Sequence, residues 1–353
     1  MKKISIIGIV GVPACYGGFE SLVENLLDHT PDDVQYTVFC TTKKYKEKLD
    51  TYKGAKLKYI NRDANGKESI LYDFEAMKRS LNSDIMLILG VSGCAFLPYI
   101  RLKYKGKIIT NIDGLEWQRN KWKWYVRKLL KYSEARAVKY SDIVIGDNRG
   151  ITNYVKQEYR RNTELIAYGG DHVQKIQDNT LYNMYQFCKE PYAVTVCRIE
   201  PENNIKCILE AFKGIKKTKL VIVGNWNGSK WGKELKNKYS IYENIHTLDS
   251  IYDSHTIDWI RSNASLYIHG HGAGGTNPSL VEAMNFGLPI LAFDCVYNRE
   301  TTEGKALYWN NSEELITLIN GNDKYDDIAQ KMQEAGKRLY TWKVIASKYN
   351  SLY

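Results

Sequence analysis

The sequence predicts an α/β protein built from two doubly wound parallel-sheet domains in tandem. Short apolar runs rich in β-branched residues alternate with amphipathic helical patterns. This alternation weakens over residues 171–190 and restarts after Pro191. A length of 353 residues also exceeds the ~250–300 over which a single core usually grows. We therefore place an N-terminal domain at residues 1–170 and a C-terminal domain at residues 171–340.

Each domain is a series of strand and helix patterns. In the first, strands are expected at 3–10, 36–40, 83–89, 106–112 and 141–147, and a helix begins at Phe19. In the second, strands are expected at 192–199, 219–224, 244–248, 265–270 and 288–293, with helices at 205–212 and 278–286. In open parallel sheets, ligands bind beyond the carboxyl ends of the strands, so the strand-to-helix loops are the candidate sites.

The charge is concentrated in the first half of the chain. Residues 1–170 carry the whole net charge of +10, and residues 99–139 alone carry +9. Such a segment attracts phosphates or an anionic membrane surface. The seven cysteines form no C-x-x-C pair, which favours free thiols in a reducing compartment. No window is apolar enough to span a membrane, and we expect a cytoplasmic protein.

The first strand leads through a glycine turn, Gly17-Gly18, into the helix that begins at Phe19. Free backbone N–H groups at a helix N-terminus attract anions, so we expect this turn to hold a phosphate. The glycine spacing does not match G-x-G-x-x-G, which disfavours a nicotinamide cofactor. A turn that serves only tight packing is the alternative.

Two carboxylates, Asp113 and Glu116, follow the strand at 106–112. A carboxylate at this edge of a sheet can orient a sugar hydroxyl or accept its proton, whereas capping a turn is the alternative for Asp113. Tryptophans then alternate with basic residues: Trp117, Arg119, Trp122, Lys123 and Trp124. This mixture is typical of a surface that docks on anionic lipid, although a helix that buries its aromatic side chains fits it too.

Two loops of the second domain carry further candidates. Arg198 lies at the end of a strand, where its forked donors can pair with a diphosphate; a surface ion pair with Glu200 or Glu202 is the alternative. After the strand at 265–270 comes a glycine-rich loop with the cap candidates Thr276 and Asn277 before a predicted helix. Glu282 on the first turns of this helix can accept hydrogen bonds from ribose or sugar hydroxyls.

No metal site is expected. His269 and His271 are spaced as two ligands could be, but the sequence offers no third ligand nearby.

These loops together resemble the retaining glycosyltransferases of family 4, and more narrowly the bacterial rhamnosyltransferases of capsule and cell-wall polysaccharide synthesis. The resemblance runs in order over nearly the whole chain and rests on the stretches GVPACYGGFESLVE, NIDGLEWQRNKW, AVKYSDIVIGDN, VCRIEPENNI, GHGAGGTNPSLVEAMNFGLPI and YTWKVIASKYNSLY. It implies a GT-B fold of two facing Rossmann-like domains, in which residues 341–353 form a helix that crosses back to the N-terminal domain. Together with the basic, tryptophan-rich segment after Asp113, it suggests a peripheral position on the inner face of the cell membrane.

The resemblance implies substrates and roles for the candidate residues. The donor would be a nucleotide sugar, first of all dTDP-L-rhamnose, and the acceptor a polyprenyl diphosphate-linked saccharide; no cofactor is required. Arg198 matches the arginine that neutralises the diphosphate, and Glu282 the glutamate that binds the ribose. Asp113 matches a position near the reacting sugar where many relatives carry histidine. The other donor contacts implied are Gly17, Gly18, Asn203, Gly274, Gly275, Thr276 and Asn277, and the acceptor or membrane side includes Glu116, Trp117, Arg119, Trp122, Lys123 and Trp124.

Two positions depart from the broad family pattern. Gly274 stands where the family has a glutamate, eight residues before Glu282, and Asn203 stands where it has a lysine. Lys230 or Lys233 is a candidate for the missing positive charge. Because of these departures, a non-catalytic nucleotide-sugar-binding protein remains an alternative, as do a UDP- or GDP-sugar transferase and an epimerase of similar shape. A nucleic-acid-binding protein is disfavoured, since the sequence contains no recognised nucleic-acid module.

Overall fold

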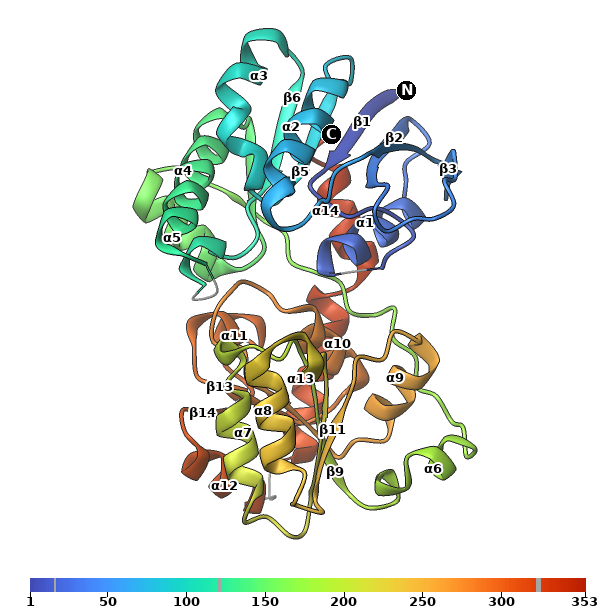
Figure 1. The fold of residues 1–353 in the computed structure, drawn as a ribbon, viewed down its shortest axis with the longest axis vertical. Coiled ribbons are helices and arrows are strands. Elements are labelled where there is room, and N and C mark those ends of the chain that lie inside the picture. Colours follow the sequence, from blue (N-terminus) through green and yellow to red (C-terminus); the bar gives the residue numbers. More distant parts are fainter. Residues whose placement is uncertain (16, 120–121, 322–324) are drawn as a thin grey trace. The chain divides into compact units, whose positions relative to one another are not determined.

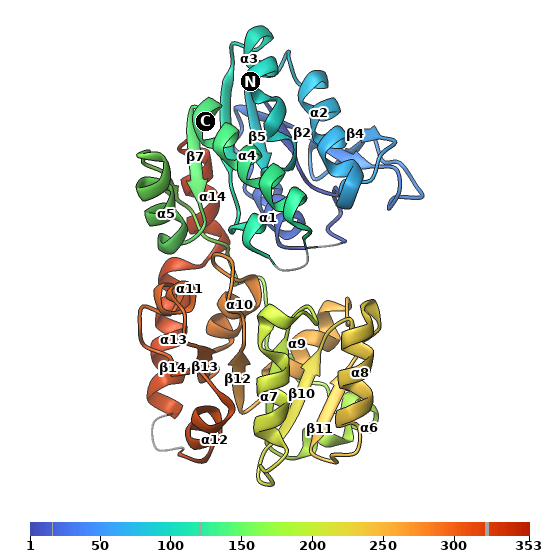
Figure 2. The same cartoon turned by 60° about the vertical axis from the view of Figure 1, so that its left-hand side comes forward.

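The computed structural model describes residues 1–15, 17–119, 122–321 and 325–353. The chain divides into two compact units (Figures 1 and 2). Unit 1 consists of Met1–Tyr168 together with Trp342–Tyr353, and unit 2 consists of Gly169–Thr341. Both units are sheets of mainly parallel strands covered by helices, so the predicted α/β class with two doubly wound domains is confirmed.

The sheet of unit 1 has eight strands in the order β3-β4-β2-β1-β5-β6-β7-β8, and among its pairings only β3 with β4 is antiparallel. Its strands are β1 (Lys2–Ile7), β2 (Val34–Thr41), β3 (Thr51–Tyr52), β4 (Ala55–Ile60), β5 (Ile85–Leu89), β6 (Lys107–Asn111), β7 (Ile143–Gly146) and β8 (Glu164–Leu165). Its helices are α1 (Gly18–Asp28), α2 (Ser69–Arg79), α3 (Leu97–Lys103), α4 (Trp124–Tyr140), α5 (Arg149–Tyr159) and α14 (Trp342–Asn350). Strand β5 is buried throughout, which explains its unbroken apolar sequence.

The end of the chain is an integral part of unit 1. Helix α14 contacts α1, and its Tyr349 hydroxyl accepts a hydrogen bond from the Asn111 side chain at 2.9 Å. Beyond the helix, the Lys107 ammonium group donates to the Leu352 carbonyl oxygen at 2.7 Å. Residues 342–353 therefore complete the core of a unit whose other residues all lie before position 169.

The sheet of unit 2 has six parallel strands in the order β11-β10-β9-β12-β13-β14. They are β9 (Tyr192–Val196), β10 (Lys219–Val223), β11 (Ile245–Leu248), β12 (Leu266–His269), β13 (Ile290–Phe293) and β14 (Leu307–Trp309). The helices are α6 (Leu181–Met184), α7 (Ile205–Phe212), α8 (Lys230–Tyr239), α9 (Ser254–Ser262), α10 (Pro278–Phe286), α11 (Val296–Thr301), α12 (Ser312–Asn320) and α13 (Tyr325–Leu339). The strand order reverses at β9, so the loops that follow β9 and β12 are neighbours at the carboxyl edge.

Short 3₁₀ helices occur in the loops of both units. They are η1 (Gly66–Glu68), η2 (Ser92–Phe96), η3 (Glu116–Gln118), η4 (Gln186–Lys189), η5 (Pro201–Asn203) and η6 (Trp226–Gly228). Among the residues that the structure describes, no helix combines the length and the apolar character that crossing a bilayer requires.

Asp73 is a buried carboxyl group in the core of unit 1. One of its oxygens accepts the Gly93 N–H at 3.0 Å, and the other has no partner among the described residues. Burial raises the pKa of Asp73 from its usual 3.8 to about 8, against the weaker opposite effect of the Gly93 hydrogen bond. A carboxyl that binds its proton more tightly when folded stabilises the protein at low pH, and this contribution is lost as the pH rises toward 8.

We therefore expect the stability of the protein to decrease between pH 5 and pH 8, by up to about 1.4 kcal/mol per pH unit for this group, and to level off above pH 8. Asp73→Asn should remove this slope in thermal unfolding measured across pH 5 to 9. The exposed Asp326→Asn is the control and should retain the wild-type slope. An unchanged slope in Asp73→Asn would show that Asp73 does not titrate in this range.

Candidate functional site

The loops after β9 and β12 are packed tightly against each other at the carboxyl edge of the sheet in unit 2. A Cβ atom on Gly270 would lie 2.1 Å from the Asn203 carbonyl oxygen, so only glycine fits there. The Gly272 N–H donates to the Glu202 carbonyl oxygen at 2.9 Å, and the Asn204 side chain donates to the Gly270 carbonyl oxygen, also at 2.9 Å. The two loops therefore form one surface.

Arg198 and Asn203 occupy the first of these loops but differ in accessibility. The Arg198 side chain is 51% exposed, and its Nε lies 3.8 Å from a Glu200 carboxylate oxygen. This distance leaves the guanidinium available to an anion. Asn203, in contrast, is 1% exposed, and its side-chain nitrogen donates to the Arg198 carbonyl oxygen at 2.6 Å. The expectation that Asn203 contacts the donor is corrected: its amide fixes the backbone that carries Arg198.

The second loop leads into helix α10 as the sequence predicts. The Asn277 side chain accepts the Ser279 N–H at 3.0 Å and caps the helix, and a proline occupies the first turn. Gly274 has a φ of +113° and open space where a side chain would be. Gly275 is half-buried and Thr276 is buried. Gly274 and Gly275 are thus half-buried and Gly274 has open space beside it, next to a helix N-terminus that favours negative charge.

Glu282 lies on α10 and is held by two residues that the sequence analysis did not identify. One carboxylate oxygen is 2.5 Å from Nη2 of Arg261, whose side chain is 7% exposed. The other oxygen is 3.3 Å from Nε2 of His172. Burial acts to raise the pKa of Glu282, but Arg261 and His172 outweigh it and the pKa is lowered. Glu282 is therefore an ionised carboxylate, which can only accept hydrogen bonds.

In unit 1, the Gly17-Gly18 turn is closed by a buried carboxylate. Glu20 is 3% exposed; one of its oxygens accepts the Gly17 N–H at 2.9 Å and the other accepts the Val10 N–H at 2.8 Å. The expectation of a free N–H at Gly17 is therefore wrong, because the side chain of Glu20, at the third position of α1, accepts it. Gly17 has an extended backbone, with φ of −155°. The glycine required here by conformation is Gly8, with φ of +96° and a Cβ position 2.1 Å from the Leu89 carbonyl oxygen.

Asp113 has an unusual backbone conformation at the end of β6. Its φ of +59° lies in the left-handed region, and its N–H donates to the Asn111 side-chain oxygen at 2.9 Å. Non-glycine residues held in this region cost about 1–3 kcal/mol and concentrate at functional sites. The side chain is half-buried. The structure thus places Asp113 at the predicted edge, in a conformation that the surrounding loop imposes.

The residues that follow Asp113 divide into two groups. The Glu116 carboxylate accepts from the Trp122 indole at 3.0 Å and pairs with Arg119 at 3.1 Å, and the Trp117 indole donates to Glu134 at 3.0 Å. These four predicted acceptor-side residues, Glu116, Trp117, Arg119 and Trp122, therefore stabilise the loop itself. Lys123 and Trp124 are exposed, as a docking surface requires.

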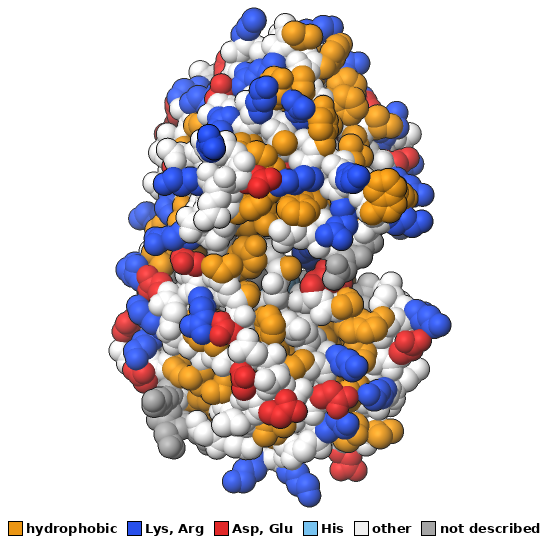
Figure 3. Space-filling model, turned by 90° about the vertical axis from the view of Figure 1, so that its left-hand side faces the viewer, with side chains coloured by type: hydrophobic (Ala, Val, Ile, Leu, Met, Phe, Trp, Pro, Cys, Tyr) orange, Lys and Arg blue, Asp and Glu red, His pale blue; other side chains and the backbone are white. Residues whose placement is uncertain are grey.

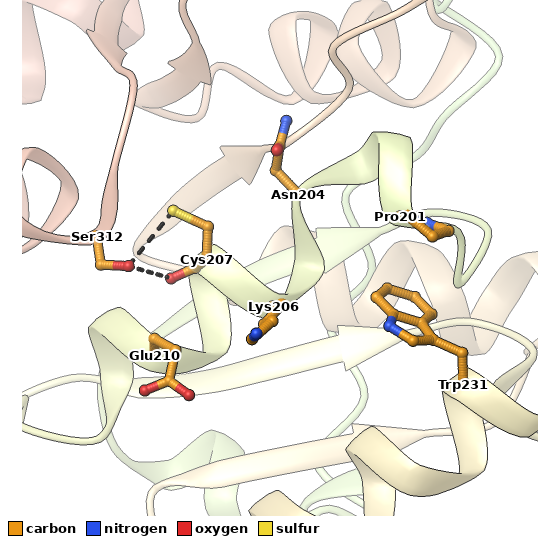
Figure 4. Close-up of a pocket in the computed structure, with 7 residues that line it drawn as sticks. All are labelled: Pro201, Asn204, Lys206, Cys207, Glu210, Trp231 and Ser312. Atoms are coloured by element: carbon orange, nitrogen blue, oxygen red, sulfur yellow. Dashed lines mark hydrogen bonds between the residues drawn. The ribbon is translucent and has the colours of Figure 1, made fainter. Parts of the chain in front are cut away.

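A separate open groove of about 420 Å³ lies beside α7 (Figure 4). Its lining residues are Pro201, Asn204, Lys206, Cys207, Glu210, Trp231 and Ser312. The Cys207 thiol and the Ser312 hydroxyl are 3.4 Å apart, and Glu210 is already paired with Lys213 and Lys238. The groove contains none of the predicted site residues.

The predicted histidines do not form part of a larger ligand set. His269 and His271 stack with ring centres 5.1 Å apart, and burial lowers the pKa of His269 to about 3. Within the described residues, no three His, Cys, Asp or Glu side chains are grouped as a metal would require.

Comparisons with known proteins agree with this geometry. Residues 1–171 match a family model described as a domain of unknown function, DUF1972. Residues 186–336, which include Arg198, Glu282 and the glycine-rich loop, match the model of glycosyl transferases group 1. This match covers most of unit 2, Gly169–Thr341. A comparison with curated proteins gave no match.

Solved structures resemble this chain over its whole length. Sucrose-phosphate synthase from Thermosynechococcus elongatus has a TM-score of 0.80 at 15% identity, and the match covers 100% of this chain and 98% of that one. HepE from Anabaena in complex with UDP has a TM-score of 0.78 at 14% identity, covering 100% and 99%. An Escherichia coli structure described as trehalose-6-phosphate bound with UDP-2-fluoro glucose has a TM-score of 0.71 at 8% identity, covering 99% and 98%. The chain thus has the two-domain GT-B fold.

Proposed function

We propose that this protein is a retaining glycosyltransferase that transfers a sugar from a nucleotide-sugar donor to a lipid-linked saccharide. The observation that carries the proposal is the loop surface of unit 2, where the loop that bears exposed Arg198 packs against the glycine-rich loop that leads into helix α10, which bears Glu282. The similar structures of HepE with UDP and with UDP-glucose support a nucleotide-sugar donor. Resemblance to the rhamnosyl branch favours dTDP-L-rhamnose as the donor, and a UDP-sugar is the second candidate.

In the proposed reaction, an acceptor hydroxyl attacks the anomeric carbon on the face from which the diphosphate leaves. The bond from the anomeric carbon to the diphosphate oxygen breaks as the new glycosidic bond forms, and the hydroxyl proton moves to the leaving phosphate oxygen. Arg198 and the N-terminus of α10 stabilise the negative charge that develops on this diphosphate. Glu282 accepts hydrogen bonds from the ribose. Gly274 and Gly275 present their backbone to the donor, and Lys230 or Lys233 supplies a second positive charge.

Asp113 of unit 1 is proposed to orient a substrate hydroxyl. We expect Asp113→Asn to reduce the rate of sugar transfer by about 10²-fold, because an amide cannot accept a proton and binds hydroxyls less strongly than a carboxylate does. Transfer from radiolabelled nucleotide sugar to a polyprenyl diphosphate-linked saccharide measures this.

Asp113→Gly is the matched control for folding, because glycine adopts the φ of +59° without strain. It should melt at or above the wild-type temperature and still lose activity. Full activity in Asp113→Asn would exclude the proposed role.

We also propose that unit 1 docks on the anionic inner face of the cell membrane through an α3–α4 surface, where a lipid-linked acceptor is found. This surface consists of Tyr99, Leu102 and Lys103 on α3 and Trp124, Tyr125, Lys128, Leu129, Tyr132 and Arg136 on α4. The two helices are in contact. Figure 3 shows apolar and basic side chains interspersed over this face of unit 1.

The chemistry of the α3–α4 surface fits anionic lipid. Trp124 is 69% and Leu102 is 75% exposed, so large apolar side chains are available for insertion at the headgroup level. Cations lie over the rings: Lys128 is 5.0 Å from the ring centre of Trp124. The only carboxylate of the two helices, Glu134, is 2% exposed and faces inward. The surface therefore combines apolar anchors with the exposed lysines Lys103 and Lys128.

We expect wild-type protein to sediment with vesicles that contain phosphatidylglycerol and not with phosphatidylcholine vesicles, because each basic residue near an anionic surface contributes about 1 kcal/mol. Removing two anchors in Trp124→Ala/Leu102→Ala should weaken this binding at least about tenfold. Tyr252→Ala in unit 2, where the side chain is 83% exposed, is the control and should bind like wild type. Equal partitioning of the wild type between both vesicle types would refute membrane docking.

A further inference from the structure

Glu282 belongs to a buried charge cluster assembled from three separate segments of unit 2. Arg261 is in the last turn of α9, and Glu282 is in the middle of α10. Arg261 also lies 3.6 Å from Asp258, so one guanidinium stands between two carboxylates. Of these two carboxylates, Glu282 is the closer partner of Arg261, because its oxygen lies 2.5 Å from the guanidinium. Burial acts to raise the pKa of Asp258, and the pKa is raised overall, whereas that of Glu282 is lowered.

The third segment is a strap that begins at Gly170 and crosses α9. A Cβ on Gly170 would lie 2.8 Å from the Glu282 backbone nitrogen, so the strap starts directly against α10. Further along, the Gln174 N–H donates to Asp258 at 2.9 Å and the Ile176 N–H to the Ser262 hydroxyl at 3.1 Å. These contacts fix the strap on both sides of the point from which His172 reaches the carboxylate of Glu282.

We propose that Arg261 is a positioning residue that gives this site its selectivity for a nucleotide whose sugar ring carries free hydroxyls, which are the 2′ and 3′ groups in UDP and the 3′ group alone in dTDP. The inference rests on the proposed function, in which Glu282 meets the ribose. Arg261 holds one carboxylate oxygen in place and keeps the group ionised, and an ionised carboxylate accepts hydrogen bonds but donates none. The ligand groups that satisfy it are hydroxyls, which donate. His172, whose side chain is 38% exposed, lies 3.3 Å from the second oxygen and can move aside for a ribose hydroxyl.

The sequence gives little indication of this role. Arg261 precedes Glu282 by 21 residues on a different helix, and His172 precedes it by 110. Only the packing of α9 and the strap against α10 brings the three together.

The test is calorimetric titration with UDP and with 2′,3′-dideoxy-UDP, which lacks both ribose hydroxyls. Wild type should bind UDP at least about tenfold more tightly, as expected for lost hydrogen bonds to a charged group. Arg261→Met should bring this ratio close to one while leaving the affinity for 2′,3′-dideoxy-UDP within about twofold of wild type. Arg261→Lys, which keeps the charge and is the variant to use if Arg261→Met does not fold, should retain an intermediate ratio.

The control is Arg299→Met, which removes an arginine bound to Asp294 at 2.5 and 2.7 Å elsewhere in unit 2. It should keep the wild-type ratio. If Arg261→Met weakens the binding of both ligands equally, Arg261 has only a structural role. The inference is then overturned, while the proposed binding of a nucleotide-sugar donor is unaffected. If wild type binds both ligands with equal affinity, Glu282 does not contact the ribose hydroxyls and the inference is overturned. If wild type binds no nucleoside diphosphate, whether UDP or dTDP, the proposed function fails together with the inference.

Discussion

Arg198→Ala is expected to reduce kcat/KM for sugar transfer by about 10²–10³-fold. Removing one preorganised donor from a developing negative charge has effects of this size. Arg198 is half exposed and 3.8 Å from the nearest carboxylate oxygen of Glu200, so the protein itself gains little from this ion pair. The loss should therefore appear in catalysis and in the affinity for a nucleoside diphosphate, with a thermal unfolding temperature close to that of wild type.

A nucleoside monophosphate distinguishes the role of Arg198 from general damage to the loop. Because the proposed contact is with the diphosphate, Arg198→Ala should weaken the binding of UDP or dTDP much more than that of the corresponding monophosphate. Arg299→Ala, again outside the candidate site, should leave both affinities unchanged. Wild-type transfer rates in Arg198→Ala would remove Arg198 from the mechanism.

Glu282→Ala is expected to destabilise unit 2 by about 3–5 kcal/mol, in addition to weakening nucleotide binding at least about tenfold. The substitution leaves Arg261, whose side chain is 7% exposed, as a buried charge without its closest partner. Asp294→Ala, which breaks an ion pair with the half-exposed Arg299, should cost at most about 1 kcal/mol. Thermal and urea unfolding of the three proteins provide the comparison.

The difference in stability between wild type and Glu282→Ala should depend on pH, and this dependence identifies the cause of the difference. The pKa of Glu282 is lowered in the folded state from its usual 4.5, so the stabilisation is complete well above pH 4.5 and decreases as the pH falls through and below that value. The gap between wild type and Glu282→Ala should therefore narrow from pH 6 toward pH 3. A gap that stays constant would mean that the loss comes from packing and not from the charge.

The fold could be predicted from sequence because its signals are local. Alternating strand and helix patterns, the Asn277 cap and the proline after it all depend on neighbouring residues. The hydrogen bond from the Gly17 N–H to Glu20 could also be predicted in principle, since Glu20 stands three residues after the N-terminal cap position of α1. The second hydrogen bond of Glu20, from the Val10 N–H, could not be predicted, because it depends on how the chain folds back after β1.

The site was harder to predict wherever burial decides the role of a residue. Asn203 and Arg198 lie five residues apart in the same loop, yet one side chain is enclosed and the other is exposed. The sequence marks both as polar and cannot distinguish them. The same holds for Trp117 and Trp124, of which the first is bonded to Glu134 and the second faces solvent. Residues such as Arg261 belong to the candidate site only through contacts between helices that lie apart in the sequence.

Because the last twelve residues, 342–353, belong to unit 1, the order of synthesis differs from the order in which the units can be completed. Unit 2 is continuous in the chain and can fold as soon as it leaves the ribosome. Unit 1 emerges first but lacks the partners of Asn111 and Lys107 until residues 342–353 have been synthesised. Removing residues 342–353 would therefore damage unit 1, although most of that unit lies before position 169.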